Sequence, residues 1–205
     1  MYLMGIDVGT TGVKTVLITP EGNLIATATS SYPLQTPYPN WVEQNPQDWW
    51  QATILSIQQI IKESSVDASR ISGIGLSGQY HGAVLIGRNH KVLRPCILWC
   101  DQRTTKQGEY IVTTAGRERL MRIACTPGFP YFTACKLLWV RENEREIYEK
   151  IFKILLPKDY IRLKLTGDFA TDVTDASGTL FLDVRERKWS REMLDCLDVD
   201  RAILP

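Results

Sequence analysis

The sequence predicts an α/β domain in which a mixed sheet is flanked by helices, and three observations support this prediction. Short apolar runs separated by turn residues occupy residues 3–32, as in an antiparallel meander. Strand-like and helix-like patterns then alternate along the chain, which is typical of an α/β fold. With 205 residues, of which 44% are hydrophobic, the chain is long enough to bury a core as one domain.

The meander is defined by its turns. Residues 3–8 and 13–18 are apolar runs, and residues 9–12 between them read Gly-Thr-Thr-Gly, a segment named here the glycine turn. Its two glycines predict backbone angles that a Cβ atom would disfavour. Residues 20–23 form a second turn signal, and the alternating pattern of residues 24–32 predicts the third strand.

A long helix is expected after a proline-containing loop over residues 32–46. Asn45 can cap its N-terminus, Pro46 suits its first position, and the pattern ends near Ser64. Apolar residues at helical spacing form a stripe that is expected to face the sheet, namely Trp50, Ile54, Ile57 and Ile61.

The remaining elements follow from local pattern and turn residues. Further strands are expected over residues 70–77, 83–86, 95–99, 150–155 and 181–184. Further helices are expected over residues 102–115, 117–124, 133–143, 157–167 and 190–197. Residues 168–179 are expected to form a loop. Gly73 and Gly75 predict that a helix approaches their strand closely.

Composition and charge exclude several classes of protein. The formal net charge is +1, which gives no electrostatic reason to expect nucleic acid or a membrane surface as a partner. No apolar run approaches the roughly 20 residues that span a bilayer, and no secretory signal sequence is expected. The five cysteines form no Cys-x-x-Cys pair, which favours reduced thiols in the cytoplasm over disulfides or zinc.

The glycine turn has the composition of a phosphate-binding loop. Its small residues let backbone N–H groups approach phosphate oxygens, and Thr10 and Thr11 add hydroxyl donors. Asp7, just before the turn, could hold the water shell of a Mg²⁺ ion. An ordinary hairpin turn has the same composition, so the turn alone leaves both interpretations open.

A second group of polar residues follows other predicted strands. Asp7, Gly9, Gln79, His81 and Asp101 lie at or just past strand ends, and ligands of open α/β sheets collect at that edge. Residues 79–82 are named here the histidine loop. Sugar recognition needs fixed donors and acceptors beside a flat apolar wall. The candidates are Gln79, His81, Asp101 and Arg103 for hydrogen bonds and Trp99 or Tyr80 for the wall.

Each candidate also has a structural interpretation. A histidine after a strand is often only a structural hydrogen-bonding residue, and Asp101 with Arg103 could be a helix cap beside a surface charge. Three tryptophans are expected to anchor the core rather than to contact a ligand, namely Trp41, Trp49 and Trp50.

Several segments together resemble the FGGY carbohydrate kinases, in the same order along the chain. Residues 5–14, GIDVGTTGVK, resemble the first phosphate loop of the actin, hexokinase and Hsp70 superfamily in its FGGY version. Residues 131–143, YFTACKLLWVREN, resemble the family's diagnostic segment, in which Lys136 and Trp139 are taken as structural. The other matching segments are WVEQNP (41–46), SGQYHG (77–82), WCDQR (99–103), LPKDY (156–160) and DVTDASGT (172–179).

The resemblance implies a ribonuclease H-like fold of the actin and hexokinase type. It also implies transfer of the γ-phosphoryl group of ATP, with Mg²⁺, to a small-molecule sugar. Within the family, the segments around residues 79–82 and 155–160 are most similar to xylulokinases, although many of those carry Met at the position of Tyr80. The implied acceptor is the 5-hydroxyl of D-xylulose. Gluconokinase, another pentulose kinase and a non-catalytic sugar-binding module stay open as alternatives.

The resemblance assigns the candidates to two sides of one site. On the phosphate side it places Asp7, as the metal and catalytic residue, with Gly9, Thr10, Thr11, Gly12 and Lys14. On the sugar side it places Gln79, Tyr80, His81, Trp99, Asp101 and Arg103. The catalytic base, an Asp in a glycine-rich GxxD-type motif, and the adenosine pocket are expected outside residues 1–205. The chain is therefore expected to be the amino-terminal domain of a longer cytoplasmic, homodimeric kinase, to stop slightly before that domain ends, and to be inactive alone.

Overall fold

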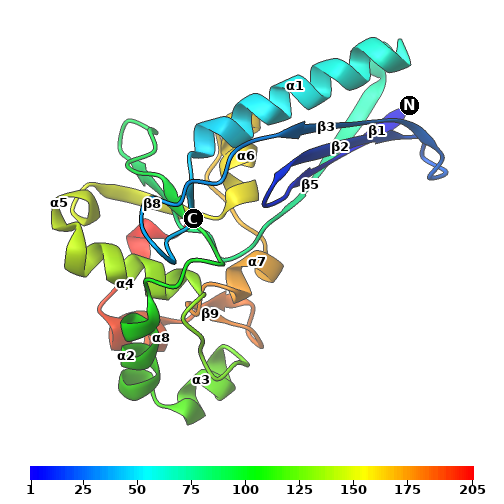
Figure 1. Cartoon of the computed structure of the whole chain (residues 1–205). Coiled ribbons are helices and arrows are strands. Elements are labelled where there is room, and N and C mark those ends of the chain that lie inside the picture. Colours follow the sequence, from blue (N-terminus) through cyan, green and yellow to red (C-terminus); the bar gives the residue numbers. More distant parts are fainter.

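The computed structural model describes residues 1–205, and a four-stranded mixed sheet forms its first part (Figure 1). β1 (Tyr2–Val8), β2 (Gly12–Ile18) and β3 (Leu24–Ser31) form the predicted antiparallel meander. β5 (Ile71–Gly78) pairs with β1 in parallel, giving the strand order β3-β2-β1-β5. The predicted mixed sheet is confirmed, and the carboxyl ends of β1 and β5 meet at the edge where the glycine turn begins.

Two helices cover one face of this sheet. α1 (Pro46–Ser64) packs on the meander, and α6 (Pro157–Thr166) packs on β1 and β5 (Figure 1). Asn45 caps α1 as predicted, since its side chain accepts a hydrogen bond from the backbone N–H of Gln47 at 3.1 Å. No helix combines the length and apolar character that crossing a membrane would require.

The prediction of which face of α1 is buried is wrong: the buried face is rotated about the helix axis by about one residue from the predicted one. Its fully buried residues include Trp49, Thr53, Ser56 and Ile60, whereas Trp50, Ile54, Ile57 and Ile61 are only partly buried. The Ser56 hydroxyl lies 2.7 Å from the Thr15 hydroxyl on β2, so both polar groups are satisfied inside the core. A stripe read from apolar residues alone misses such paired hydroxyl groups.

The opposite face of the sheet is open. A Cβ atom placed on Gly75 would meet no atom within 4 Å, and one on Gly73 would meet only the Leu3 side chain at 3.5 Å, so the helix that approaches this strand, α6, does not pack against the two glycines. Asp7, Lys14 and Ser77 lie on this open face, around a shallow hollow of about 330 Å³.

A second hydrophobic core lies beyond the ladder formed by β6 (Val84–Gly87) and β8 (Ile151–Leu155). β6 separates the two cores, because Val84 and Ile86 pack into the sheet core while Leu85 packs into the second core. The helices around the second core are α2 (Thr105–Ala115), α3 (Arg117–Ile123), α4 (Thr133–Asn143) and α8 (Arg191–Leu197). The other short elements are β4 (Glu43–Gln44), η1 (Ala68–Arg70), α5 (Arg145–Tyr148), β9 (Leu182–Asp183), β10 (Lys188–Trp189) and η2 (Arg201–Ile203).

Two local predictions need correction. The strand expected over residues 95–99 is only β7 (Cys96–Ile97), which pairs with β4 and not with the main sheet. The loop expected over residues 168–179 contains a helix, α7 (Val173–Ser177), capped by Asp172. The Asp172 carboxylate accepts backbone hydrogen bonds from Thr174 and Asp175 at 2.8 and 3.1 Å. Five helical residues are too few to show a hydrophobic period.

Candidate functional site

The glycine turn and the histidine loop lie side by side at one edge of the sheet. The backbone N–H of Gln79 donates to the carbonyl oxygen of Val8 at 2.8 Å, which ties the end of β5 to the end of β1. The indole N–H of Trp99 donates to the Thr10 hydroxyl at 3.2 Å. The predicted proximity of these two segments is therefore confirmed, and Trp99 joins them.

The glycine turn presents free backbone donors. Gly9 N–H donates to Gly12 O at 3.0 Å and closes the turn, whereas the N–H groups of Thr10 and Thr11 have no protein acceptor. Two adjacent unpaired amides suit a phosphate oxygen. The backbone-angle argument for the glycines needs correction, because neither has a φ in the left-handed region. Close packing is the reason at Gly12, where a Cβ atom would lie 2.8 Å from the carbonyl oxygen of Ser30.

Asp7 and Lys14 lie opposite one another on neighbouring strands of the open sheet face. Both are exposed, and neither forms an ion pair or side-chain hydrogen bond within the chain. The Asp7 carboxylate is thus free to accept hydrogen bonds from metal-bound water, which fits the Mg²⁺ that the resemblance implies. The Tyr32 hydroxyl donates to the carbonyl oxygen of Gly9. Burial, with a smaller contribution from the Asp7 charge, raises the pKa of Tyr32, so this donor keeps its proton.

Gln44 organises the space between the two segments, and sequence reasoning assigned it no function. Its amide N–H donates to the carbonyl oxygen of Thr10 at 2.8 Å, and its Oε1 accepts from Trp49 and from Gln79, both at 3.0 Å. Gln79 is 6% exposed, and its Oε1 is buried without a partner. Gln79 therefore supports the site from inside and keeps one acceptor unused. The only sequence signal for Gln44 was its position in WVEQNP.

Aromatic rings form an exposed wall beside the glycine turn. Tyr80 is 48% exposed, and its ring centroid lies 5.7 Å from that of Trp99 and 4.4 Å from that of His81. Tyr131, 37% exposed, extends the wall with its ring 5.3 Å from His81. Tyr131 was not predicted as a site residue, although it opens the diagnostic segment. The rings are tilted relative to one another, and an exposed aromatic face among them suits the apolar face of a sugar ring.

His81 is held tightly in this wall. Its backbone is left-handed, with φ of 62°, and its Nδ1 lies 2.9 Å from the carbonyl oxygen of Gly178. Burial lowers the pKa of His81 to about 4, the Gly178 hydrogen bond opposes that shift, and the charge of Lys136 adds to it. Lys136 is fully buried beneath the wall and donates to the carbonyl oxygen of Tyr131, in agreement with the structural assignment from the sequence. His81 is thus a neutral imidazole at pH 7.

Asp101 and Arg103 are buried, which corrects the predicted sugar contacts. Arg103 pairs with Asp101 at 2.7 Å and with Glu43 at 2.6 Å, and the Arg103 and Asp101 side chains are 1% and 0% exposed. The Asp101 carboxylate also accepts from the backbone N–H of Val42 at 2.6 Å. The Arg103 guanidinium stacks 3.7 Å from the ring centroid of Trp41. The hydrogen bonds of Asp101 and Arg103 are all made within the fold, so neither side chain is available to contact a sugar.

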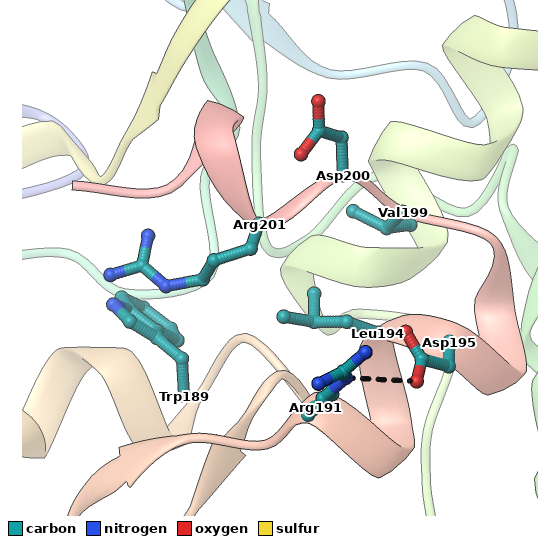
Figure 2. Close-up of a pocket in the computed structure, with 7 residues that line it drawn as sticks. All are labelled: Trp189, Arg191, Leu194, Asp195, Val199, Asp200 and Arg201. Atoms are coloured by element: carbon teal, nitrogen blue, oxygen red, sulfur yellow. Dashed lines mark ion pairs between the residues drawn. The ribbon is translucent and has the colours of Figure 1, made fainter.

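A cavity of about 500 Å³ lies elsewhere, between β10, α8 and η2 (Figure 2). Figure 2 shows the Arg201 side chain beside the indole of Trp189, and Arg191 paired with Asp195 at 3.5 Å. None of the predicted site residues lines this cavity.

Comparisons with known proteins agree on one family. Residues 2–205 match the sequence pattern described as "FGGY family of carbohydrate kinases, N-terminal domain". Xylulose kinase of Escherichia coli (strain K12) is 42% identical over 205 residues, and xylulose kinase of Bacillus subtilis (strain 168) is 40% identical over 204. The matches cover 100% of this chain but 41% of each relative, so the chain spans about two fifths of their length.

Solved structures show the same likeness. The crystal structure of a "xyloylose kinase" from Brucella ovis superposes with a TM-score of 0.95 at 40% identity, over 100% of this chain and 42% of that one. Gluconate kinase from Lactobacillus acidophilus superposes with a TM-score of 0.92 at 29% identity, over 100% of this chain and 41% of that one. The expected fold class, shared by sugar kinases of the actin and hexokinase type, is confirmed.

Proposed function

Because this chain belongs to the FGGY family of carbohydrate kinases, we propose that it supplies the sugar pocket and phosphate turn of an ATP-dependent kinase that converts D-xylulose to xylulose 5-phosphate. The observation that carries the proposal is the junction at Thr10, where the free amides of the glycine turn meet the aromatic wall through Trp99. A sugar stacked on that wall lies beside a loop able to bind phosphate.

The two sides of the site have different tasks. His81 and the ring of Tyr80 hold and orient the sugar, and Gln79 supports the loop from inside. The amides of Thr10 and Thr11 bind phosphoryl oxygens of ATP, and Asp7 is the residue that would hold the water shell of a bound Mg²⁺. Bound Mg²⁺ would neutralise negative charge on the transferred phosphoryl group. The sugar hydroxyl loses its proton to a base that the resemblance places outside residues 1–205.

A steady-state assay tests the proposal on the protein expressed from its natural reading frame. ADP release is measured with ATP and Mg²⁺ against D-xylulose, other pentuloses and D-gluconate. We expect kcat/KM for D-xylulose to exceed the others at least tenfold. The likeness to gluconate kinase makes a preference for gluconate the competing outcome. Binding of D-xylulose without any ATP-dependent product would instead identify a sugar-binding module.

Cellular location and assembly belong to the same proposal. The structure contains no helix that could cross a membrane, and the cytoplasmic location and homodimer stay predictions from the resemblance. Light scattering of the full-length protein measures its assembly directly, and a mass other than that of a dimer would contradict the prediction.

A further inference from the structure

The hydrogen bond between His81 and Gly178 determines which ring nitrogen of His81 faces the sugar. A backbone carbonyl oxygen only accepts hydrogen bonds, so at 2.9 Å from Gly178 O the Nδ1 atom of His81 must carry a proton. In a neutral imidazole the other nitrogen, Nε2, is then an acceptor. A sugar hydroxyl can donate to that nitrogen.

We propose that Gly178 is a positioning residue for sugar recognition, because its carbonyl oxygen fixes His81 in the Nδ1–H tautomer and its missing side chain lets the imidazole ring approach. This inference rests on the proposed function. A Cβ atom on Gly178 would lie 2.5 Å from His81 Nδ1 and 2.6 Å from Cε1, far inside van der Waals contact. The φ of Gly178 is −77°, which alanine can adopt, and the carbonyl oxygen of Asp175 would lie 3.3 Å from the added Cβ, so the imidazole is the main obstacle to a side chain there.

Gly178 lies at the end of a segment that a partly buried ion cluster ties to α6. Gly178 ends α7, a helix of five residues that is too short to be stable without tertiary contacts. Lys158 on α6 binds Asp172 and Asp175 of the α7 segment at 2.6 and 3.0 Å. The same ammonium group lies 2.8 Å from Asp159 on its own helix. Lys158 therefore connects the sheet-covering helix α6 to the carbonyl group that orients His81.

Thr133, the first residue of α4, also contacts the carbonyl oxygen of Gly178. The Thr133 hydroxyl lies 3.3 Å from the carbonyl oxygen of His81 and 3.4 Å from that of Gly178. The backbone N–H of Ala134 donates to the carbonyl oxygen of Thr179 at 3.1 Å. The histidine loop, α7 and the start of α4 thus form one hydrogen-bonded unit around the imidazole.

Nitrogen NMR tests the tautomer directly, because the chain has only two histidines, His81 and His90. Long-range ¹H–¹⁵N spectra at pH 7 should show Nδ1 of His81 protonated and Nε2 unprotonated. In Gly178→Ala that tautomer should no longer dominate, whereas in the control Gly73→Ala, where a Cβ makes only an ordinary contact at 3.5 Å, it should persist. An Nε2–H tautomer in the unchanged chain would overturn the proposal even if Gly178→Ala failed to fold. So would a folded Gly178→Ala that keeps the Nδ1–H tautomer.

Calorimetric titration with D-xylulose, on the protein in its natural reading frame, tests the consequence for binding. Loss of one hydrogen bond to the sugar should raise Kd about tenfold in Gly178→Ala, with no change in Gly73→Ala. Equal affinities of the unchanged protein and Gly178→Ala would overturn the positioning role. If the unchanged protein bound no sugar, the proposed function would fail, while the NMR result would still decide the tautomer.

Discussion

Replacing Arg103 by methionine should destabilise the fold strongly. Methionine keeps an apolar stem against Trp41 but removes the charge that neutralises Asp101 and helps to neutralise Glu43. Asp101 would keep only its two backbone donors, the N–H groups of residues 42 and 103. Leaving a buried carboxylate without its partner costs about 3–5 kcal/mol. The exposed pair of Arg145 with Glu149 offers a matched control, since Arg145→Met removes a pair that is largely solvated.

Urea unfolding followed by tryptophan fluorescence measures the difference. With a slope of about 2 kcal/mol/M for a chain of this size, the midpoint of Arg103→Met should fall by roughly 1.5–2.5 M. The midpoint of Arg145→Met should be unchanged within error. If Arg103→Met unfolded at the same midpoint as the unchanged chain and instead lost sugar affinity, the guanidinium would be a sugar contact after all, and its structural assignment would be refuted.

Four further predictions concern the site, the pH dependence of stability and the activity of residues 1–205 alone. In the full-length protein, Asp7→Asn should lower kcat more than it raises the KM for D-xylulose, and His81→Ala should do the reverse; an Asp7→Asn variant with intact kcat would contradict the phosphate-side assignment. Since the pKa of His81 is lowered to about 4, sugar affinity should stay constant from pH 8 to pH 5. Because this folded pKa lies below the unfolded value, the contribution of His81 to stability should fall as pH drops from 6.5 through 4. Calorimetric titrations across pH measure the affinity, and a loss centred near pH 6.5 would count against a neutral imidazole. The chain of residues 1–205 alone should release ADP at background rate, and turnover of about 1 s⁻¹ or more would disprove its dependence on a second domain.

The parts of the fold that follow from local pattern could be predicted from the sequence. The meander follows from apolar runs separated by turn residues, and the start of α1 follows from Asn45 and Pro46. The adjacency of the glycine turn and the histidine loop follows from the carboxyl ends of two strands meeting at one edge. These features depend on residues close together in the chain or on a general rule of sheet topology.

The features that the sequence did not reveal depend on partners distant in the chain. Asp101 and Arg103 are residue types that often contact sugars. They are buried because Glu43 and Trp41, distant in the sequence, pack against Arg103. Gln44 becomes important because three segments converge on its amide group. The buried face of α1 includes Ser56, whose hydroxyl pairs with that of Thr15 on β2. A hydrophobic period along the helix cannot predict this contact.

A crystal structure of the full-length protein with D-xylulose tests the central claim most directly. We expect the sugar to lie against Tyr80 and Trp99, with a hydroxyl donating to Nε2 of His81 and the 5-hydroxyl directed to the glycine turn. Sugar bound in the cavity of Trp189 and Arg201, or at any site away from the glycine turn, would contradict it.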